Sequence, residues 1–168
     1  LFPSMMPALF EAHEESPIPL ATLRHVQSGG ENCPPRVMER FQRTWPHINL
    51  QLGYGSTECG LVTMLEDDEV TARPGSVGRT VPGHRVEIRD ASGNPLGVGE
   101  IGEAWVAAPS ATQGYWGMPE LNAEQIHDGW VRTGDYARVD EDGYLYIEGR
   151  AKDLVISKGQ NVCPAEVE

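Results

Sequence analysis

The stretch LGYGSTE at residues 52–58 decides how the rest of the chain is interpreted. An apolar segment leads into it, and glycines flank Tyr54, so the backbone can turn sharply and approach a ligand closely. Two hydroxyls and a carboxylate follow, on Ser56, Thr57 and Glu58. A ring can lie against a base, a hydroxyl can donate to a phosphate oxygen, and a carboxylate can hold a phosphate-bound Mg²⁺. The stretch therefore indicates a nucleotide site, with an ordinary glycine-rich turn as the alternative.

Composition limits the classes of protein to consider. The chain has 168 residues, of which 39% are hydrophobic and 23% charged, a composition typical of one globular domain or parts of two. Its net charge of −12 argues against nucleic acid or anionic lipid as the main partner, because both require clustered lysine and arginine. A small phosphate ligand stays possible, since it needs only local donors and a metal.

The cysteines indicate the cellular compartment, and the chain ends indicate whether the sequence is part of a longer protein. Cys33, Cys59 and Cys163 are odd in number and far apart, which predicts neither a disulfide framework nor a metal site and favours the reducing cytoplasm. The first residues lack a basic region and a long apolar run, so neither a signal peptide nor a membrane span is predicted. Because the chain starts without methionine and residues 165–168 resemble a starting helix, both ends are interpreted as cuts from a longer protein.

Apolar residues at helical spacing predict two helices in the first part of the chain. One covers residues 3–15, and the other begins at the proline pair 34–35 and ends before Pro46. The second helix carries an apolar stripe that is expected to pack in the core: Val37, Met38, Phe41 and Trp45.

Two short apolar strands, residues 23–27 and 48–52, alternate with these helices and predict a parallel α/β unit over residues 1–62. In such sheets ligands bind beyond the carboxyl ends of the strands. Each strand runs into a glycine-rich turn, at Gly29 and at Gly53, so the two turns are expected to line one cleft.

A β-rich subdomain is expected over residues 63–148, because helical periodicity mostly disappears there. Strand patterns occur at residues 85–88 and 104–107, and turn signals at residues 90–95 and 140–143 separate the strands.

The same region contains an acidic run, and a hinge and a second domain are expected after it. The run EDDE at residues 66–69 is interpreted as a solvated surface loop. A hairpin is predicted over residues 136–148, with its turn at an Asp-Gly pair. Residues 149–152 are interpreted as a hinge, and residues 153–168 as the start of a small C-terminal α+β domain.

Two single residues have side chains suited to a nucleotide sugar. Asp135 follows a glycine at the end of a strand, and a carboxylate can accept two hydrogen bonds from a vicinal diol such as ribose. Arg150 offers a rigid fork of donors for oxygen-rich ligands. The ordinary alternative for Asp135 is a helix cap or turn acid, and for Arg150 it is a surface salt bridge.

Taken together, four ordered stretches make the chain resemble the adenylate-forming superfamily: acyl-CoA synthetases, adenylation domains of peptide synthetases, and firefly luciferase. The stretches are YGSTE at 54–58, WVRTGD at 130–135, GYLYIEGR at 143–150 and KDLVISKGQNVCPAEVE at 152–168, with supporting matches SGGE at 28–31 and GYW at 114–116. The resemblance covers essentially the whole chain. It implies the C-terminal part of the large adenylate-forming domain, then a hinge, then the start of the small domain.

The resemblance implies a role for each matched residue. Thr57 would contact the α-phosphate of ATP, and Glu58 would hold Mg²⁺. Tyr54 would stack on adenine, Asp135 would bind the ribose hydroxyls, and Arg150 would contact ribose or phosphate. The other implied nucleotide-binding positions are Gly30, Glu31, Asn32, Gly53, Gly55 and Ser56.

Three further positions would serve the second half of the reaction. Lys152 would lie in the hinge about which the small domain rotates. Lys158 and Gly159 would lie near the pantetheine channel of coenzyme A, where a glycine leaves room for a narrow thioester channel.

The implied activity is the ATP-dependent activation of a carboxylic acid, with a fatty acid as the first expectation and an aryl acid as the second. The carboxylate attacks the α-phosphate to give an acyl-adenylate and pyrophosphate, and the thiol of coenzyme A then displaces AMP. The expected partners are therefore the acid, ATP, Mg²⁺, coenzyme A and the rest of the polypeptide.

Two parts of the family pattern are missing from the sequence: an upstream Ser/Thr/Gly-rich loop that grips the β- and γ-phosphates, and a downstream lysine that touches the reacting carboxylate. The chain alone is therefore expected to be inactive. Three alternatives stay open: an adenylation domain that loads a carrier-protein thiol, a non-catalytic nucleotide-binding relic, and a β-rich interaction domain. Ser56 favours an acyl-CoA synthetase over a peptide-synthetase domain, which usually has proline there.

Overall fold

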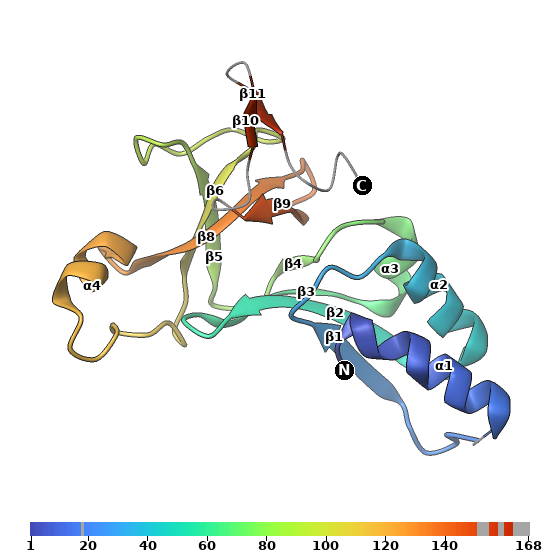
Figure 1. Ribbon diagram of the computed structural model, residues 1–168. Helices are drawn as coiled ribbons and strands as arrows, with labels where there is room; N and C mark the ends of the chain where they lie inside the picture. The colour runs from blue at the N-terminus through green and yellow to red at the C-terminus, as the bar shows by residue number, and fades with distance from the viewer. Residues whose placement is uncertain (18, 151–154, 158–159, 163–168) are drawn as a thin grey trace.

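The structure, a computed structural model, describes residues 1–17, 19–150, 155–157 and 160–162. Its first part is built on a mixed sheet, sheet A, in which β1 and β2 run parallel and the other neighbours run antiparallel (Figure 1). The strands of sheet A, in spatial order, are β1 (His25–Gly29), β2 (Asn49–Ser56), β3 (Gly60–Leu65) and β4 (Arg79–Thr80).

Helices pack against sheet A and form its hydrophobic core. The helical elements are η1 (Pro3–Met5), α1 (Met6–Glu15), α2 (Pro35–Thr44) and α3 (Asp67–Ala72). The predicted stripe on α2 is confirmed, because Met38, Phe41 and the following Trp45 are all buried in one cluster with Leu50 and Leu52 of β2. Removing these large apolar side chains from water supplies the main driving force for this half of the fold.

The second part is an antiparallel sheet, sheet B, with the strand order β5-β6-β8-β7 and β9 paired to β8. Its elements, with the helix that precedes β7, are β5 (Arg85–Arg89), β6 (Gly102–Ala107), α4 (Pro119–Gln125), β7 (Ile126–His127), β8 (Trp130–Val139) and β9 (Leu145–Arg150). The predicted hairpin is confirmed as β8–β9. A separate antiparallel pair, β10 (Val155–Ser157) and β11 (Gln160–Val162), follows.

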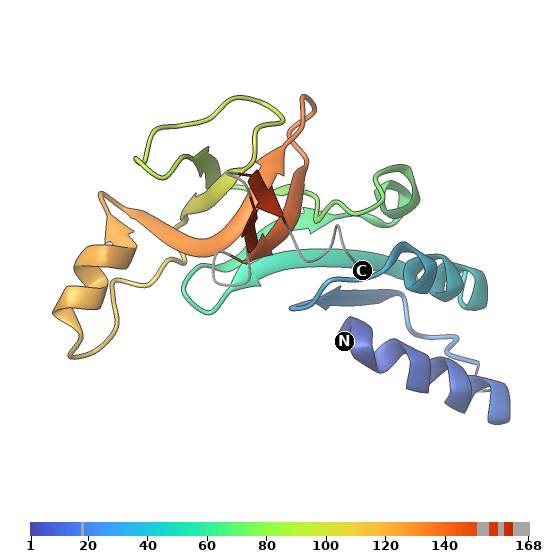
Figure 2. The ribbon, with the colours of Figure 1, turned by 45° about the horizontal axis from the view of Figure 1, so that its top comes forward.

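Hydrogen bonds connect the two parts at both ends of the sheets. The amide of Val77 donates to the carbonyl of Leu145, which links the segment before β4 to β9. At the other end, the turn between β2 and β3 reaches the loop between β6 and α4 (Figure 2), where Thr112 donates to the carbonyl of Glu58. The predicted α/β class, an α/β unit followed by a β-rich part, is therefore confirmed.

The glycines around Tyr54 do not form the predicted turn. They belong to β2, which continues to Ser56, and the change of direction comes only at the residues before Gly60. Likewise β1 begins at His25 and includes Gly29, two residues beyond the strand predicted at residues 23–27. Glycine in a strand can mark close approach of a second backbone instead of a turn, and that is its use here.

The acidic run at residues 66–69 is not the predicted surface loop, because it starts helix α3. Glu66 and Glu69 form a capping box, in which each side chain accepts a hydrogen bond from the other residue's backbone amide. The run therefore supplies the capping groups that a helix start requires, and α3 buries Val70 in the core.

The expected domain boundaries fall differently on the elements. Strand β3 crosses the boundary expected after residue 62, and sheet A continues to Thr80. The prediction places the boundary too early because the sequence of β3 carries no signal that separates it from the strands of the β-rich part. Gly149 and Arg150, expected in a hinge, are the last residues of β9. Lys152 lies outside the described residues, so the hinge stays a prediction.

Within the described part of the chain, no helix is both long enough and apolar enough to cross a lipid bilayer.

Replacement of Gly78 by alanine is expected to destabilise the protein more than replacement of Gly99. Both glycines have positive φ, +89° and +79°, so both variants carry the left-handed backbone penalty of about 1 kcal/mol. A Cβ on Gly78 would also lie 2.0 Å from the carbonyl oxygen of Met64, whereas a Cβ on Gly99 would meet nothing within 4 Å. Urea denaturation should show an additional loss of about 2 kcal/mol for Gly78→Ala. Equal losses would contradict the close packing of Gly78 against β3.

Candidate functional site

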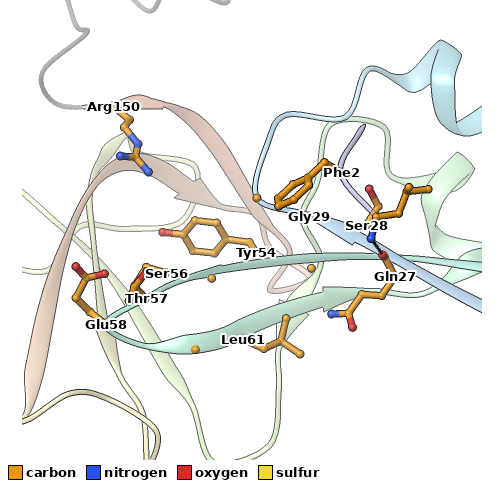
Figure 3. A pocket seen from close by; sticks show the side chains of 15 residues that line it. Phe2, Gln27, Ser28, Gly29, Tyr54, Ser56, Thr57, Glu58, Leu61 and Arg150 are labelled. Atoms are coloured by element: carbon orange, nitrogen blue, oxygen red, sulfur yellow. Dashed lines mark hydrogen bonds between the residues drawn. The ribbon is translucent and has the colours of Figure 1, made fainter. Parts of the chain in front are cut away.

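A cavity of about 770 Å³ opens at the carboxyl ends of β1 and β2 (Figure 3). Its lining includes every residue from 53 to 58, together with Gly29, Gly30 and Arg150. The two glycine-rich segments therefore line one cleft, as the sequence predicts, although both belong largely to strands.

Glycine is required in this wall because the backbones approach one another closely. Gly29 pairs with Gly53 across β1 and β2, and a Cβ on Gly29 would lie 2.3 Å from the carbonyl oxygen of Gly53. A Cβ on Gly55 would lie 2.0 Å from the carbonyl oxygen of Gly60. The pairing of β2 with β3 also shifts register between Tyr54 and Gly55, an irregularity of the kind that redirects side chains near sites.

A tight turn presents the hydroxyl and the carboxylate at the edge of the cavity. The amide of Cys59 donates to Ser56 Oγ at 3.2 Å, and Gly60 closes the turn with φ +70°. Thr57 is exposed at the tip and Glu58 is half-buried beside it. The turn thus holds two potential phosphate and metal contacts on one short segment.

The carboxylate of Glu58 is held by a tyrosine from a distant loop. The hydroxyl of Tyr115 donates to Glu58 Oε1 at 2.6 Å. This hydrogen bond is the main cause that lowers the pKa of Glu58, and the positive charge of Arg150 acts in the same direction. Glu58 is therefore a carboxylate anion at neutral pH.

A second carboxylate, that of Asp135, lies behind the cavity wall and contacts two side chains that line the cavity. Tyr54 donates from its hydroxyl to Asp135 Oδ2 at 2.7 Å, and Arg150 Nε lies 3.1 Å from Asp135 Oδ1. Asp135 and Arg150 are direct cross-strand partners on β8 and β9, which explains how residues distant in sequence meet. Burial, and then the charge of Asp135, raise the pKa of Tyr54, so its hydroxyl stays a donor.

Figure 3 shows the side chains of Tyr54, Glu58 and Arg150 directed toward a common space, with Phe2 at the opposite end of the cavity. Asp135 is only 5% exposed and does not line this space, while Arg150 is 62% exposed. The structure therefore places Glu58 and Arg150 at one cavity, with Asp135 behind its wall in contact with Tyr54 and Arg150.

Other predicted positions lie elsewhere. Glu31 points to the start of the first helix, where its carboxylate accepts hydrogen bonds from the amide and the hydroxyl of Ser4. Asn32 is exposed and does not line the cavity. Lys152, Lys158 and Gly159 lie outside the described residues.

Sequence reasoning missed Tyr115 and Phe2 as residues of the site. The GYW match at residues 114–116 marked the position of Tyr115, but no local pattern shows that its hydroxyl reaches Glu58. Phe2 lines the cavity, and its ring lies so close to Gly30 that a Cβ there would be only 2.9 Å away. This is a contact between distant segments, which no local pattern contains.

Known proteins resemble this chain both in sequence and in structure. Residues 1–116 match the family described as AMP-binding enzyme. The chain is 37% identical over 161 residues to the long-chain-fatty-acid–CoA ligase of Yersinia pestis, which covers 96% of this chain and 28% of the relative.

Two solved structures are similar over 100% of this chain and 34% of their own. The amide bond synthetase McbA of Marinactinospora thermotolerans is 36% identical with a TM-score of 0.92. The O-succinylbenzoate coenzyme A synthetase MenE of Bacillus subtilis, in complex with ATP and magnesium ion, is 29% identical with a TM-score of 0.89. The chain thus spans about a third or less of the length of these proteins.

Replacement of Tyr54 by phenylalanine removes a donor to a buried carboxylate. Near neutral pH the variant should unfold with a free energy about 2 kcal/mol lower than the parent, the scale of a hydrogen bond to a charged group. Above pH 10.0, the ordinary pKa of tyrosine, the difference should shrink, because the unfolded parent then ionises Tyr54 while the folded parent does not.

Urea denaturation between pH 7 and pH 11 measures this difference. Tyr146→Phe is the control, because its hydroxyl makes a longer contact of 3.3 Å with Asp140. A Tyr54→Phe loss no larger than the control's would show that the Tyr54–Asp135 bond contributes little.

Proposed function

The chain belongs to the AMP-binding enzyme family, and we propose that it supplies the adenylate-binding part of an acid–thiol ligase that activates a carboxylic acid with ATP. The convergence of Tyr54, Glu58 and Arg150 on one cavity carries the proposal. These residues come from β2, from the turn after it and from β9, so only the folded chain brings them together.

The nucleotide end of the cavity fits AMP. We assign the ring of Tyr54 to adenine, with the backbone of Gly30 and Gly53 beside it, because glycine allows a flat base to approach. Asp135 is assigned to the ribose hydroxyls and Arg150 to ribose or phosphate. A carboxylate offers about four lone-pair positions, and Tyr54 and Arg150 use two of those on Asp135. Acceptors for a diol therefore stay free on Asp135, although its carboxylate lies behind the cavity wall.

The phosphate end fits a magnesium nucleotide. Thr57 is assigned to the α-phosphate, and Glu58 to the ion, because it is ionised and half-buried at the cavity edge. No group of three histidine, cysteine, aspartate or glutamate side chains gathers among the residues that the structure describes, so phosphates and water would complete the coordination. When bound, Mg²⁺ supplies positive charge that offsets the charge developing on the phosphate oxygens.

The residues of this chain position the reactants and neutralise charge. An oxygen of the substrate carboxylate attacks the α-phosphate of ATP, the bond to the β-phosphate breaks, and an acyl-adenylate and pyrophosphate result. The thiol of coenzyme A then attacks the acyl carbon and AMP leaves. A fatty acid is the first candidate for the acid, supported by the name of the Yersinia pestis relative, and an aryl acid is the second.

The whole activity requires a longer polypeptide, because the chain spans 28% to 34% of the proteins it resembles. We assign the hinge to Lys152 and the coenzyme A channel to Lys158 and Gly159. The buried free thiols of Cys33 and Cys59 fit a reducing compartment such as the cytoplasm.

Carboxylate-dependent exchange of labelled pyrophosphate into ATP tests the function. The complete polypeptide should exchange with fatty acids of at least one chain length or with an aryl acid, and the 168-residue chain alone should not. Exchange by the isolated chain at an enzymatic rate would contradict the assignment of essential parts to other segments. Binding of AMP by the complete polypeptide without exchange for any acid would instead identify a nucleotide-binding relic.

Glu58→Gln in the complete polypeptide should lower kcat/KM for adenylate formation by about 100-fold at low Mg²⁺, because a neutral amide binds the ion weakly. Raising the Mg²⁺ concentration should recover part of the loss. Glu124→Gln is a matched control, since Glu124 is an exposed carboxylate on α4. If Glu58→Gln has an unchanged Mg²⁺ titration, Glu58 is not a ligand of the ion.

A further inference from the structure

The loop between β6 and α4 contacts Glu58 at two points. The hydroxyl of Tyr115 donates to Glu58 Oε1 at 2.6 Å, and the amide of Thr112 donates to the carbonyl oxygen of Glu58 at 2.7 Å. Side chain and main chain of the same residue are therefore both held by one loop that is distant in sequence. The loop contains the GYW match, to which the proposed reaction assigns no role.

Tyr115 is itself fixed by Asn122 of helix α4. The Tyr115 amide donates to Asn122 Oδ1 at 2.6 Å, and Asn122 Nδ2 donates back to the Tyr115 carbonyl at 3.0 Å. The preceding Gly114 has φ +142°, and a Cβ there would lie 2.8 Å from Asn122 Nδ2. The glycine thus allows the amide of Asn122 to pair with both polar groups of the Tyr115 backbone.

This arrangement matters because Glu58 lies next to the tip of a turn. A glutamate side chain at such a place has several rotamers, and only some direct its oxygens into the cavity. A hydrogen bond to one oxygen restricts the side chain to the rotamers that keep that bond, as partners of metal ligands commonly do. Tyr115 is partly exposed, so filling the core is not its main contribution.

We propose that Tyr115 is a positioning residue for Glu58, fixed in turn by Asn122, and that this pair sets the affinity of the site for the metal–nucleotide complex. The inference rests on the proposed role of Glu58 as a ligand of Mg²⁺. Tyr115 is not among the residues that line the cavity, so its effect on the ion would be exerted through Glu58.

The test uses the complete polypeptide with Mn²⁺ in place of Mg²⁺, with ATP and without a carboxylic acid, so that no turnover occurs. Electron paramagnetic resonance measures the Kd for Mn²⁺·ATP, and calorimetry measures the Kd for AMP without metal. Tyr115→Phe should weaken Mn²⁺·ATP binding about tenfold, the lower end for loss of such a partner, and leave AMP binding unchanged. Asn122→Ala should produce a loss in the same direction.

Tyr144→Phe is the matched control, because its hydroxyl makes the same kind of bond to Glu69, away from the cavity. It should leave both Kd values unchanged. An unchanged Mn²⁺·ATP Kd in Tyr115→Phe overturns the inference, and so does an equal loss of metal-free AMP binding, which would indicate a general collapse of the pocket. If the parent polypeptide binds neither AMP nor Mn²⁺·ATP, the proposed function itself fails.

Discussion

The buried carboxylate of Asp135 joins the two halves of this structure. A buried charge is costly unless it is paired, and here Tyr54 from sheet A and Arg150 from sheet B both bind it. The ring of Tyr54 also packs against two hydrophobic clusters, so the same residue links core packing to the polar network. The position of sheet B relative to sheet A is therefore coupled to the shape of the cavity, and the cavity forms only when the two sheets meet correctly.

Close backbone contact is the second requirement of the cavity wall. Gly29 against Gly53, and Gly55 against Gly60, allow three strands to approach so closely that no Cβ fits between them. The space above these glycines is left for a ligand. Larger side chains would separate the strands and would also move the turn that carries Thr57 and Glu58.

Short-range patterns in the sequence predicted what depends on near neighbours. The buried stripe of α2, the β8–β9 hairpin and the grouping of residues 53–58 at one cavity were all predictable. The glycines around Tyr54 indicate a turn by their local pattern, and this prediction is wrong because their role depends on the facing strands. The contacts of Glu31 with Ser4 and of Tyr115 with Glu58 join distant segments, so no local pattern contains them.

Tyr54, Thr57 and Asp135 are proposed to bind the three parts of one adenylate: its base, its phosphate and its ribose. A crystal structure of the complete polypeptide with AMP tests this proposal most directly. We expect the adenine against the ring of Tyr54, the ribose hydroxyls at Asp135 and the phosphate beside Thr57. AMP bound away from this cavity, or a cavity that stays empty at saturating AMP while the nucleotide occupies another site, would contradict it.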